Sequence, residues 1–313
     1  MKRFQLSGYV FALLGASFFS LKAVLVKLAY LADGPLEPIV LLALRMGFAL
    51  PVYLVIGVSV WRRRGAVPMR PVFYSFVLGL LGYYLCALLD FTGLQYITAQ
   101  LERILLFTYP IFVVVIGAMF FGGRITRWGV LAIVLAYTGI GIIFIGGDIT
   151  QGDNLWLGTV LILATAFLFA MFQLFAKGLI TQLGSWLFTC IAMSGAATGI
   201  LLHFTGYAVT GDGVRAALRL PTEVYIIGLA IALLSTIIPS FLVNIAIDRI
   251  GSQATSVLAM VGPITTIIAA ILILHEPFGW VDALGTSVTI LGIGLYTWFD
   301  RKYQPIKPMP LKT

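Results

Sequence analysis

The chain is a succession of long apolar stretches separated by short polar junctions. A helix needs about 20 apolar residues to cross the roughly 30 Å hydrocarbon core of a bilayer. Turn residues or charges mark the junctions, for example Asp33-Gly34-Pro35 and Gly146-Gly147-Asp148. The pattern therefore predicts an all-α integral membrane protein with ten transmembrane helices, over residues 7–31, 38–61, 72–91, 96–121, 125–146, 156–177, 183–205, 222–246, 252–275 and 279–299.

The second half of the chain is similar to the first half at an offset of 153 residues. The matches include Gln100 with Gln253, Pro110 with Pro263, and Gly139-Ile140-Gly141 with Gly292-Ile293-Gly294. Chance similarity between apolar helices is the alternative explanation. A unit of five spans is odd, so its second copy enters the membrane from the opposite side. We therefore expect two inverted five-helix repeats, over residues 1–147 and 155–300, and a basic cytoplasmic tail over 301–313.

Composition agrees with a membrane environment. Of the 313 residues, 60% are hydrophobic and 10% are charged, which leaves too little polar surface to coat a water-soluble globule. Cys86 and Cys190 lie in separate apolar runs, so their spacing favours buried thiols over a disulfide framework or a metal cluster. No nucleotide-binding loop or other cofactor motif is present in the sequence, and we expect no cofactor.

The net charge of +8 comes from short basic clusters between the apolar stretches rather than from one soluble face, which argues against nucleic-acid binding. Among the loops on the side opposite the N-terminus, basic residues occur only at Arg215 and Arg219. The other loops and both termini hold Lys2, Arg3, Arg62, Arg63, Arg64, Arg70, Arg124, Arg127, Lys177, Arg249, Arg301, Lys302, Lys307 and Lys312. Positively charged loops remain in the cytoplasm, so we expect both termini there, in a bacterial inner membrane.

Two segments carry a family resemblance. They run from Gln95 to Gly141, with Pro110, and from Asn244 to Gly294, with Gly251-Ser252-Gln253-Ala254, Pro263 and His275-Glu276-Pro277. The chain resembles the EamA repeats of the drug/metabolite transporter superfamily. The resemblance implies a ten-helix metabolite carrier, often an exporter of amino acids, that works by alternating access. In that family a Glu commonly closes the helix after the proline; Glu276 matches, but the first half has Gly123-Arg124, so we expect a helix-end role.

Charged residues inside the spans are the first candidates for a site, because each costs at least about 2.5 kcal/mol on insertion scales. Lys22 lies near the middle of the first span, and we expect it to bind a substrate carboxylate or to pair with Asp90 or Glu102. Arg45 and Glu102 are interpreted either as a structural ion pair or as gating and substrate residues. The surplus of positive charge favours an anionic or zwitterionic substrate. The full set of intramembrane charges is Lys22, Lys27, Arg45, Asp90, Glu102 and Arg103.

Uncharged residues complete the predicted site. Aromatic side chains are typical of the walls of a small-molecule pocket. Gln253 offers an uncharged hydrogen bond from the second half. Pro110 and Pro263 are expected to kink their helices and to free backbone carbonyls. The expected aromatic wall consists of Tyr83, Tyr84, Phe107 and Tyr109.

We conclude from the sequence that the chain is a secondary transporter of a small polar metabolite, most readily an amino acid or related carboxylate moved by export. A multidrug, nucleoside or other metabolite carrier, and a channel-like facilitator, remain alternatives. An intramembrane enzyme lacks a recognisable nucleophile or metal motif, and a scaffold or receptor explains the buried charges less well. The expected partners are a small-molecule substrate and membrane lipid. The sequence leaves open whether transport is coupled to protons through Asp90 or Glu102. It also leaves open whether the protein is a monomer or a homodimer.

Overall fold

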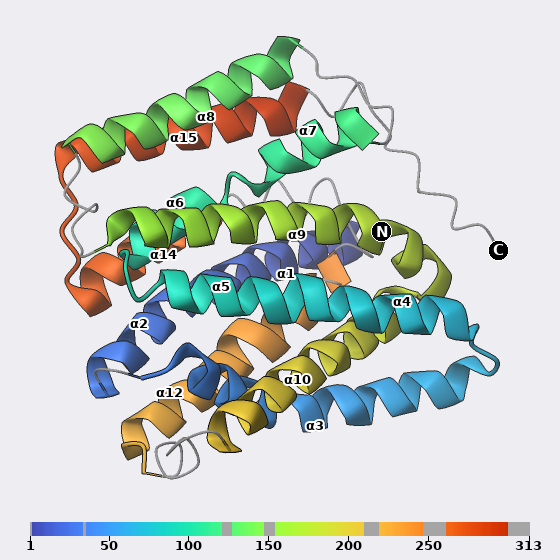
Figure 1. Ribbon diagram of the computed structural model, residues 1–313. Helices are drawn as coiled ribbons and strands as arrows, with labels where there is room; N and C mark the ends of the chain where they lie inside the picture. The colour runs from blue at the N-terminus through green and yellow to red at the C-terminus, as the bar shows by residue number, and fades with distance from the viewer. Residues whose placement is uncertain are drawn as a thin grey trace.

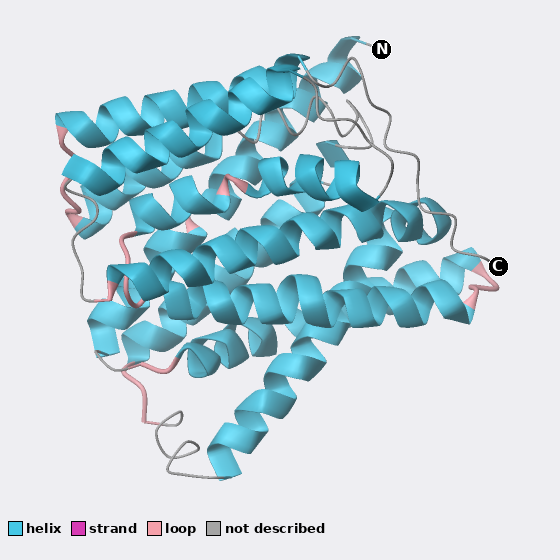
Figure 2. Cartoon of the chain, turned by 45° about the horizontal axis from the view of Figure 1, so that its top comes forward, coloured by secondary structure: helices cyan, strands magenta, loops and turns pink. Residues whose placement is uncertain are grey.

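The computed structural model describes residues 2–33, 36–120, 127–146, 154–209, 219–243, 245–246 and 261–299. Every regular element in these segments is helical (Figure 2). A helix satisfies its own backbone hydrogen bonds, which is the requirement that a lipid environment imposes on an apolar chain.

The first half contains helices in each of its five predicted ranges. Two of these ranges hold interrupted helices: the first breaks at Leu21 and the fourth at Phe107 and Thr108. The third contains a π-helical segment, η1. In chain order the elements are α1 (Lys2–Ser20), α2 (Lys22–Asp33), α3 (Pro38–Arg64), α4 (Met69–Gly79), η1 (Leu80–Leu85), α5 (Cys86–Gly93), α6 (Ala99–Leu106), α7 (Tyr109–Phe120) and α8 (Arg127–Gly146).

The second half is also helical throughout its described residues. Its third and fourth predicted ranges each contain a π-helical segment, η3 and η4. The elements are α9 (Leu155–Leu183), α10 (Ser185–Val209), α12 (Thr222–Ala232), η3 (Leu233–Ile237), α14 (Val261–Ala269), η4 (Ala270–Leu274) and α15 (Trp280–Phe299).

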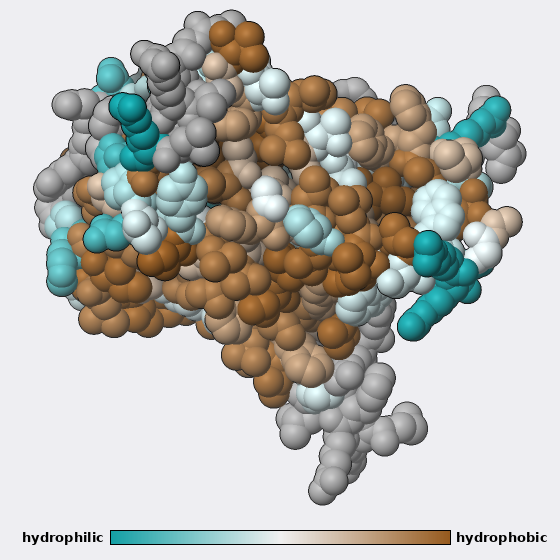
Figure 3. Space-filling model, turned by 90° about the horizontal axis from the view of Figure 1, so that it is seen from below, coloured by the Kyte–Doolittle hydropathy of each residue, from teal (hydrophilic) through white to brown (hydrophobic). Residues whose placement is uncertain are grey.

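Six helical segments in the described part of the chain are long and apolar enough to cross a membrane, and shorter apolar helices cover Ile133–Gly146 and Val261–Leu274. The surface in Figure 3 is mostly hydrophobic, with hydrophilic side chains gathered toward its left and right edges. The six segments are Ser7–Asp33, Pro38–Arg64, Met69–Gly93, Leu155–Leu183, Ser185–Val209 and Thr222–Val243. The count of ten spans and their inverted arrangement stay predictions.

The two halves are in extensive contact. α8 packs along α15, and the two lie side by side at the top of Figure 1. A Cβ atom added to Gly139 of α8 would collide with the backbone oxygen of Gly285 in α15, so the absence of a side chain allows this close approach. α3 packs on α10, α5 packs on α9, and α12 packs on both α2 and α3. These contacts place charged residues of the first half beside helices of the second.

Candidate functional site

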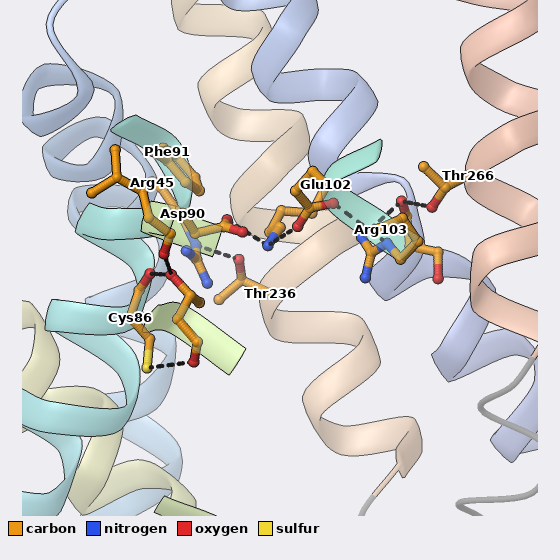
Figure 4. A network of polar contacts seen from close by, with 12 residues as sticks. Arg45, Cys86, Asp90, Phe91, Glu102, Arg103, Thr236 and Thr266 are labelled. Carbon is orange, nitrogen blue, oxygen red and sulfur yellow. Dashed lines mark hydrogen bonds and ion pairs between the residues drawn. The ribbon is translucent and has the colours of Figure 1, made fainter. Parts of the chain in front are cut away.

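Five charged side chains are buried together near the middle of the molecule. Each is at most 6% exposed, and they come from four different elements, α2, α3, α5 and α6 (Figure 4). Burying isolated charges in an apolar interior is costly, so such residues must be paired or must serve a ligand. The five are Lys22, Arg45, Asp90, Glu102 and Arg103.

Lys22 sits between two carboxylates. Its Nζ is 2.5 Å from Oδ2 of Asp90 and 3.3 Å from Oε1 of Glu102. Glu102 also faces Arg103, whose Nε is 3.7 Å from Oε2 of Glu102. These four residues form a charge-balanced group, called the ionic cluster below. The prediction that Lys22 pairs with Asp90 or Glu102 is fulfilled by both carboxylates at once, so its charge is compensated within the protein.

The break in the first helix supplies a backbone ligand to this cluster. α1 ends at Ser20, and the turn at Leu21 leaves the Ser20 carbonyl oxygen available. Arg103 donates from Nη2 to this oxygen at 3.2 Å, and Thr266 of α14 donates from Oγ1 at 2.8 Å. The break therefore connects α1, α6 and α14, which belong to different halves of the chain.

The break in the fourth helix lies just before Pro110. α6 ends at Leu106, the hydroxyl of Thr108 donates to the Leu105 carbonyl oxygen at 2.7 Å, and α7 starts at Tyr109. Pro110 is the second residue of α7, where its missing N–H costs nothing. The predicted span 96–121 is thus interrupted next to Pro110, as expected for a proline that cannot donate to the carbonyl oxygen four residues earlier, although the break is complete and precedes the proline.

Pro263 is the third residue of α14 as described. The chain before Val261 lies outside the described residues, so the predicted kink at Pro263 stays a prediction. Gln253 also lies outside the described residues. The ring of Phe107, at the break in the fourth helix, lies against Gly262, so the two predicted proline regions are neighbours.

Arg45 does not join the ionic cluster. Its Nε donates to Oγ1 of Thr236 at 2.8 Å, and its guanidinium carbon lies 5.7 Å from the centre of the Phe91 ring (Figure 4). The predicted ion pair between Arg45 and Glu102 is wrong, because Glu102 faces Lys22 and Arg103 instead. Arg45 links α3 to η3 of the second half.

The predicted aromatic wall is only partly assembled. Tyr83 packs edge-on against Phe172 at 4.8 Å between ring centres, and Tyr109 packs against Phe169 at 5.1 Å. Phe169 and Phe172 stack on each other, and Phe107 contacts Tyr109, so the rings form one connected series. Tyr84 is elsewhere: its hydroxyl is 3.0 Å from Nδ1 of the exposed His203.

A cavity of about 470 Å³ opens between α3, α4 and α10. It runs along α3 from Tyr53 to Arg62, and the hydroxyl of Tyr53 is 3.3 Å from the Thr236 carbonyl oxygen and 3.1 Å from Oγ of Ser240. Its lining is otherwise formed by Leu54, Gly57, Val58, Trp61, Phe76, Leu187, Cys190, Ile191 and Ser194. Tyr53 thus links the cavity to Thr236, the residue that binds Arg45.

Several of these partners were not singled out from the sequence. Ser20, Tyr53 and Thr236 contribute a carbonyl or hydroxyl inside apolar runs, where a lone polar residue is a weak signal. Glu276, expected at a helix end, accepts hydrogen bonds from the backbone N–H groups of Ala99 and Gln100 at 2.8 and 3.3 Å. It caps α6 from the other half. In the described segments, no group of three His, Cys, Asp or Glu residues is placed to hold a metal ion.

Comparison with known proteins gives a family. The model of the EamA-like transporter family matches residues 6–145 and again residues 156–298. The relative named "Uncharacterized transporter YcbK", from Bacillus subtilis, is 27% identical over 89% of each chain. An "Uncharacterized transporter" from Synechocystis is 24% identical over 94% of each chain.

A solved crystal structure has the same fold. It superposes with a TM-score of 0.60 over 95% of this chain and 98% of its own, at 14% sequence identity. A sequence identity of 14% supports similarity of fold and nothing further. The family model, in contrast, covers most of the chain in two matches. The chain belongs to the EamA-like transporter family, and is therefore an integral membrane transport protein rather than an enzyme.

Proposed function

We propose that this transporter moves a small polar metabolite that carries a carboxylate, with an amino acid as the first candidate, by alternating access and in the direction of export. The observation that carries the proposal is the group of buried charges beside interrupted helices. Interrupted helices with polar groups at the bilayer midplane are the usual plan of substrate sites in secondary transporters. Lys22 of the ionic cluster directly follows the break at Leu21. Glu102 and Arg103 lie in α6, and this helix ends at the second break.

The contacts between halves support a site at their interface. Arg45 bonds to Thr236, and the Ser20 carbonyl oxygen accepts from both Arg103 and Thr266. The contacts of Arg45 with Thr236 and of Thr266 with Ser20 join one half to the other, and such contacts can exchange when the halves rock against each other. Burying charged and polar side chains inside a membrane protein costs free energy, and a protein that does not transport would gain nothing from burying several of them together.

Helix pairing supports the proposed inverted repeat. Numbering the predicted spans in order, an inverted duplication exchanges span one with six, two with seven, and so on. The contact of α4 with α9 then corresponds to that of α12 with α2, and the contact of α4 with α10 corresponds to that of α12 with α3. The hydroxyl of Thr289 donates to the Ala136 carbonyl oxygen at 3.3 Å, between residues that are 153 apart, the offset of the sequence repeat.

The energy source and orientation belong to the same proposal. Proton coupling through Asp90 or Glu102 is one candidate energy source, but both carboxylates face Lys22, and these ion pairs argue against it and favour a substrate gradient. We propose both termini in the cytoplasm of a bacterial inner membrane. The predicted division into residues 1–147 and 155–300 and the basic tail at 301–313 is retained.

Uptake into proteoliposomes tests the function. The purified protein is reconstituted and offered a radiolabelled amino-acid mixture, with and without a pH gradient, beside protein-free liposomes and a heat-inactivated sample. Saturable uptake above both controls is the expected result, and acceleration by the gradient would support proton coupling. No uptake of any amino acid would remove that substrate class and favour nucleosides or drugs, whereas uptake that does not saturate would favour a channel-like facilitator.

A further inference from the structure

Arg45 is a buried cation that forms no ion pair in the described part of the chain, and its acidic electrostatic neighbour, Asp90, already pairs with Lys22. Arg45 is 5% exposed, and its Nε donates a hydrogen bond to Oγ1 of Thr236. Within the described residues no ion pair involves Arg45, and Nη1 and Nη2 make no hydrogen bond. Lys22 and Arg103, in contrast, each face a carboxylate. Figure 4 shows the guanidinium beside Thr236, with its one hydrogen bond running to that residue.

Two π-helical segments flank this guanidinium. Thr236 lies in η3, and Tyr83, an electrostatic neighbour of Arg45, lies in η1. η1 begins at Leu80 and η3 begins at Leu233, which are separated by the 153-residue offset of the sequence repeat. π-Helical turns are rare and occur frequently at functional sites. Corresponding turns of the two halves thus each contribute a residue that interacts with Arg45, Thr236 by a hydrogen bond and Tyr83 electrostatically.

Thr236 fixes the direction of the guanidinium. Its hydroxyl donates to the Ile231 carbonyl oxygen at 3.0 Å and so presents a lone pair to Nε of Arg45. The guanidinium carbon of Arg45 also lies 5.7 Å from the centre of the Phe91 ring, within the range of a cation–π contact. A guanidinium held at Nε leaves Nη1 and Nη2 as a planar pair of donors, which matches the two oxygens of a carboxylate.

The cavity between α3, α4 and α10 approaches this position at Tyr53. Tyr53 lines the cavity, and its hydroxyl contacts the carbonyl oxygen of Thr236. Arg62 lies at the other end of the cavity, nine residues further along α3, which is about 13 Å at the rise of an α-helix.

We propose that Arg45, rather than Lys22, binds the carboxylate of the transported metabolite, through Nη1 and Nη2. The inference rests on the proposed function and names the residue that selects the substrate. The carboxylates of the ionic cluster already face Lys22 and Arg103, so Arg45 leaves a surplus of one positive charge in the group, which a ligand carboxylate can compensate. Tyr53 and Tyr83 provide polar and aromatic surface around the same group.

Arg45→Gln is an informative variant because it removes a charge without leaving a carboxylate unpaired. Thr236 keeps its bond to Ile231, so we expect the variant to fold. Arg45→Lys keeps the charge but loses the planar donor pair. Arg63→Gln is the matched control, since it removes an exposed arginine from the end of the same helix.

The test combines uptake and competition in proteoliposomes. Uptake of the labelled amino-acid mixture should fall at least tenfold in Arg45→Gln, fall less in Arg45→Lys, and stay unchanged in Arg63→Gln. In the wild type, unlabelled L-leucine should compete better than L-leucinamide, which lacks the carboxylate, and Arg45→Gln should lose this preference. Equal uptake by Arg45→Gln and the wild type, with the preference intact, would overturn the proposal while leaving the transport function standing.

A second measurement keeps the proposal testable if the wild type transports no amino acid. Thermal unfolding of the detergent-solubilised protein is followed with added acetate, succinate or phosphate, in the wild type, Arg45→Gln and Arg63→Gln. Stabilisation by a carboxylate in the wild type and Arg63→Gln, lost in Arg45→Gln, would support the anion site independently of the cargo. Stabilisation that is absent, or that persists unchanged in Arg45→Gln, would overturn it; stabilisation by phosphate alone would overturn the choice of a carboxylate.

Discussion

Lys22 holds two buried carboxylates in place, so its loss should be felt first in stability. Lys22→Ala leaves Asp90 and Glu102 without their shared cation, and breaking a buried ion pair costs about 3–5 kcal/mol. We expect a marked fall in the thermal unfolding temperature of the detergent-solubilised variant. Adding Asp90→Asn to Lys22→Ala removes one orphaned charge and should restore part of the loss. A double variant less stable than Lys22→Ala would contradict this account of the cluster.

Glu276 provides a residue-scale test of how the halves are joined. It accepts from the backbone of Ala99 and Gln100 at the start of α6, and loss of a helix cap costs about 0.5–2 kcal/mol. Glu276→Ala should therefore lower the unfolding temperature. Glu223→Ala, at the exposed start of α12, is the control and should have a smaller effect. Equal effects of the two substitutions would argue against the cap.

The sequence predicted which charges are buried but not how they pair. The cost of a charge inside an apolar run is a property of the run itself, so hydropathy alone was enough to select Lys22, Asp90 and Glu102. Pairing depends on which helices are neighbours and how each is rotated. The predicted partner of Arg45 was Glu102, whereas Arg45 reaches across to Thr236 of the other half. Nothing in a single sequence specifies that neighbour.

At the scale of elements, the contact of α8 with α15 depends on Gly139. A Cβ atom there would collide with the backbone of Gly285, whereas nothing lies within 4 Å of a Cβ atom added to Gly141. Gly139→Ala should therefore lower stability by about 1–3 kcal/mol, the usual cost of overpacking. Gly141→Ala should be neutral or slightly stabilising, because alanine favours the helix. Thermal unfolding of both variants checks this, and equal behaviour would show that the helices can move apart freely.

The elements were predictable as far as hydropathy determines them. Each described helix falls within or close to a predicted span, because apolar length and charged junctions mark helix ends. The breaks at Leu21 and Phe107 and the π-helical segments were not predictable, because the apolar pattern continues through them. Pro110 indicated a kink in the fourth span, but not that the helix would end and restart there. Such local departures are set by tertiary contacts like those of Ser20.

For the whole molecule, the proposed mechanism requires that the two ends of α3 face opposite aqueous compartments. Glu37 precedes this helix and Ala66 follows it, and both are exposed. A helix of 27 residues is about 40 Å long, which exceeds the hydrocarbon core. The basic run at Arg62, Arg63 and Arg64 then predicts that the Ala66 end is cytoplasmic.

Cysteine labelling tests this orientation. With Cys86 and Cys190 replaced by serine, a membrane-impermeant maleimide should label Glu37→Cys in intact cells and Ala66→Cys only after permeabilisation. The reverse pattern would place the basic loop, and with it the entrance of the cavity that leads to Tyr53, outside the cell. Because export requires the site to load from the cytoplasm, that result would favour uptake as the direction. Labelling of both positions in intact cells would mean that α3 does not cross the membrane, and alternating access through this site would fail.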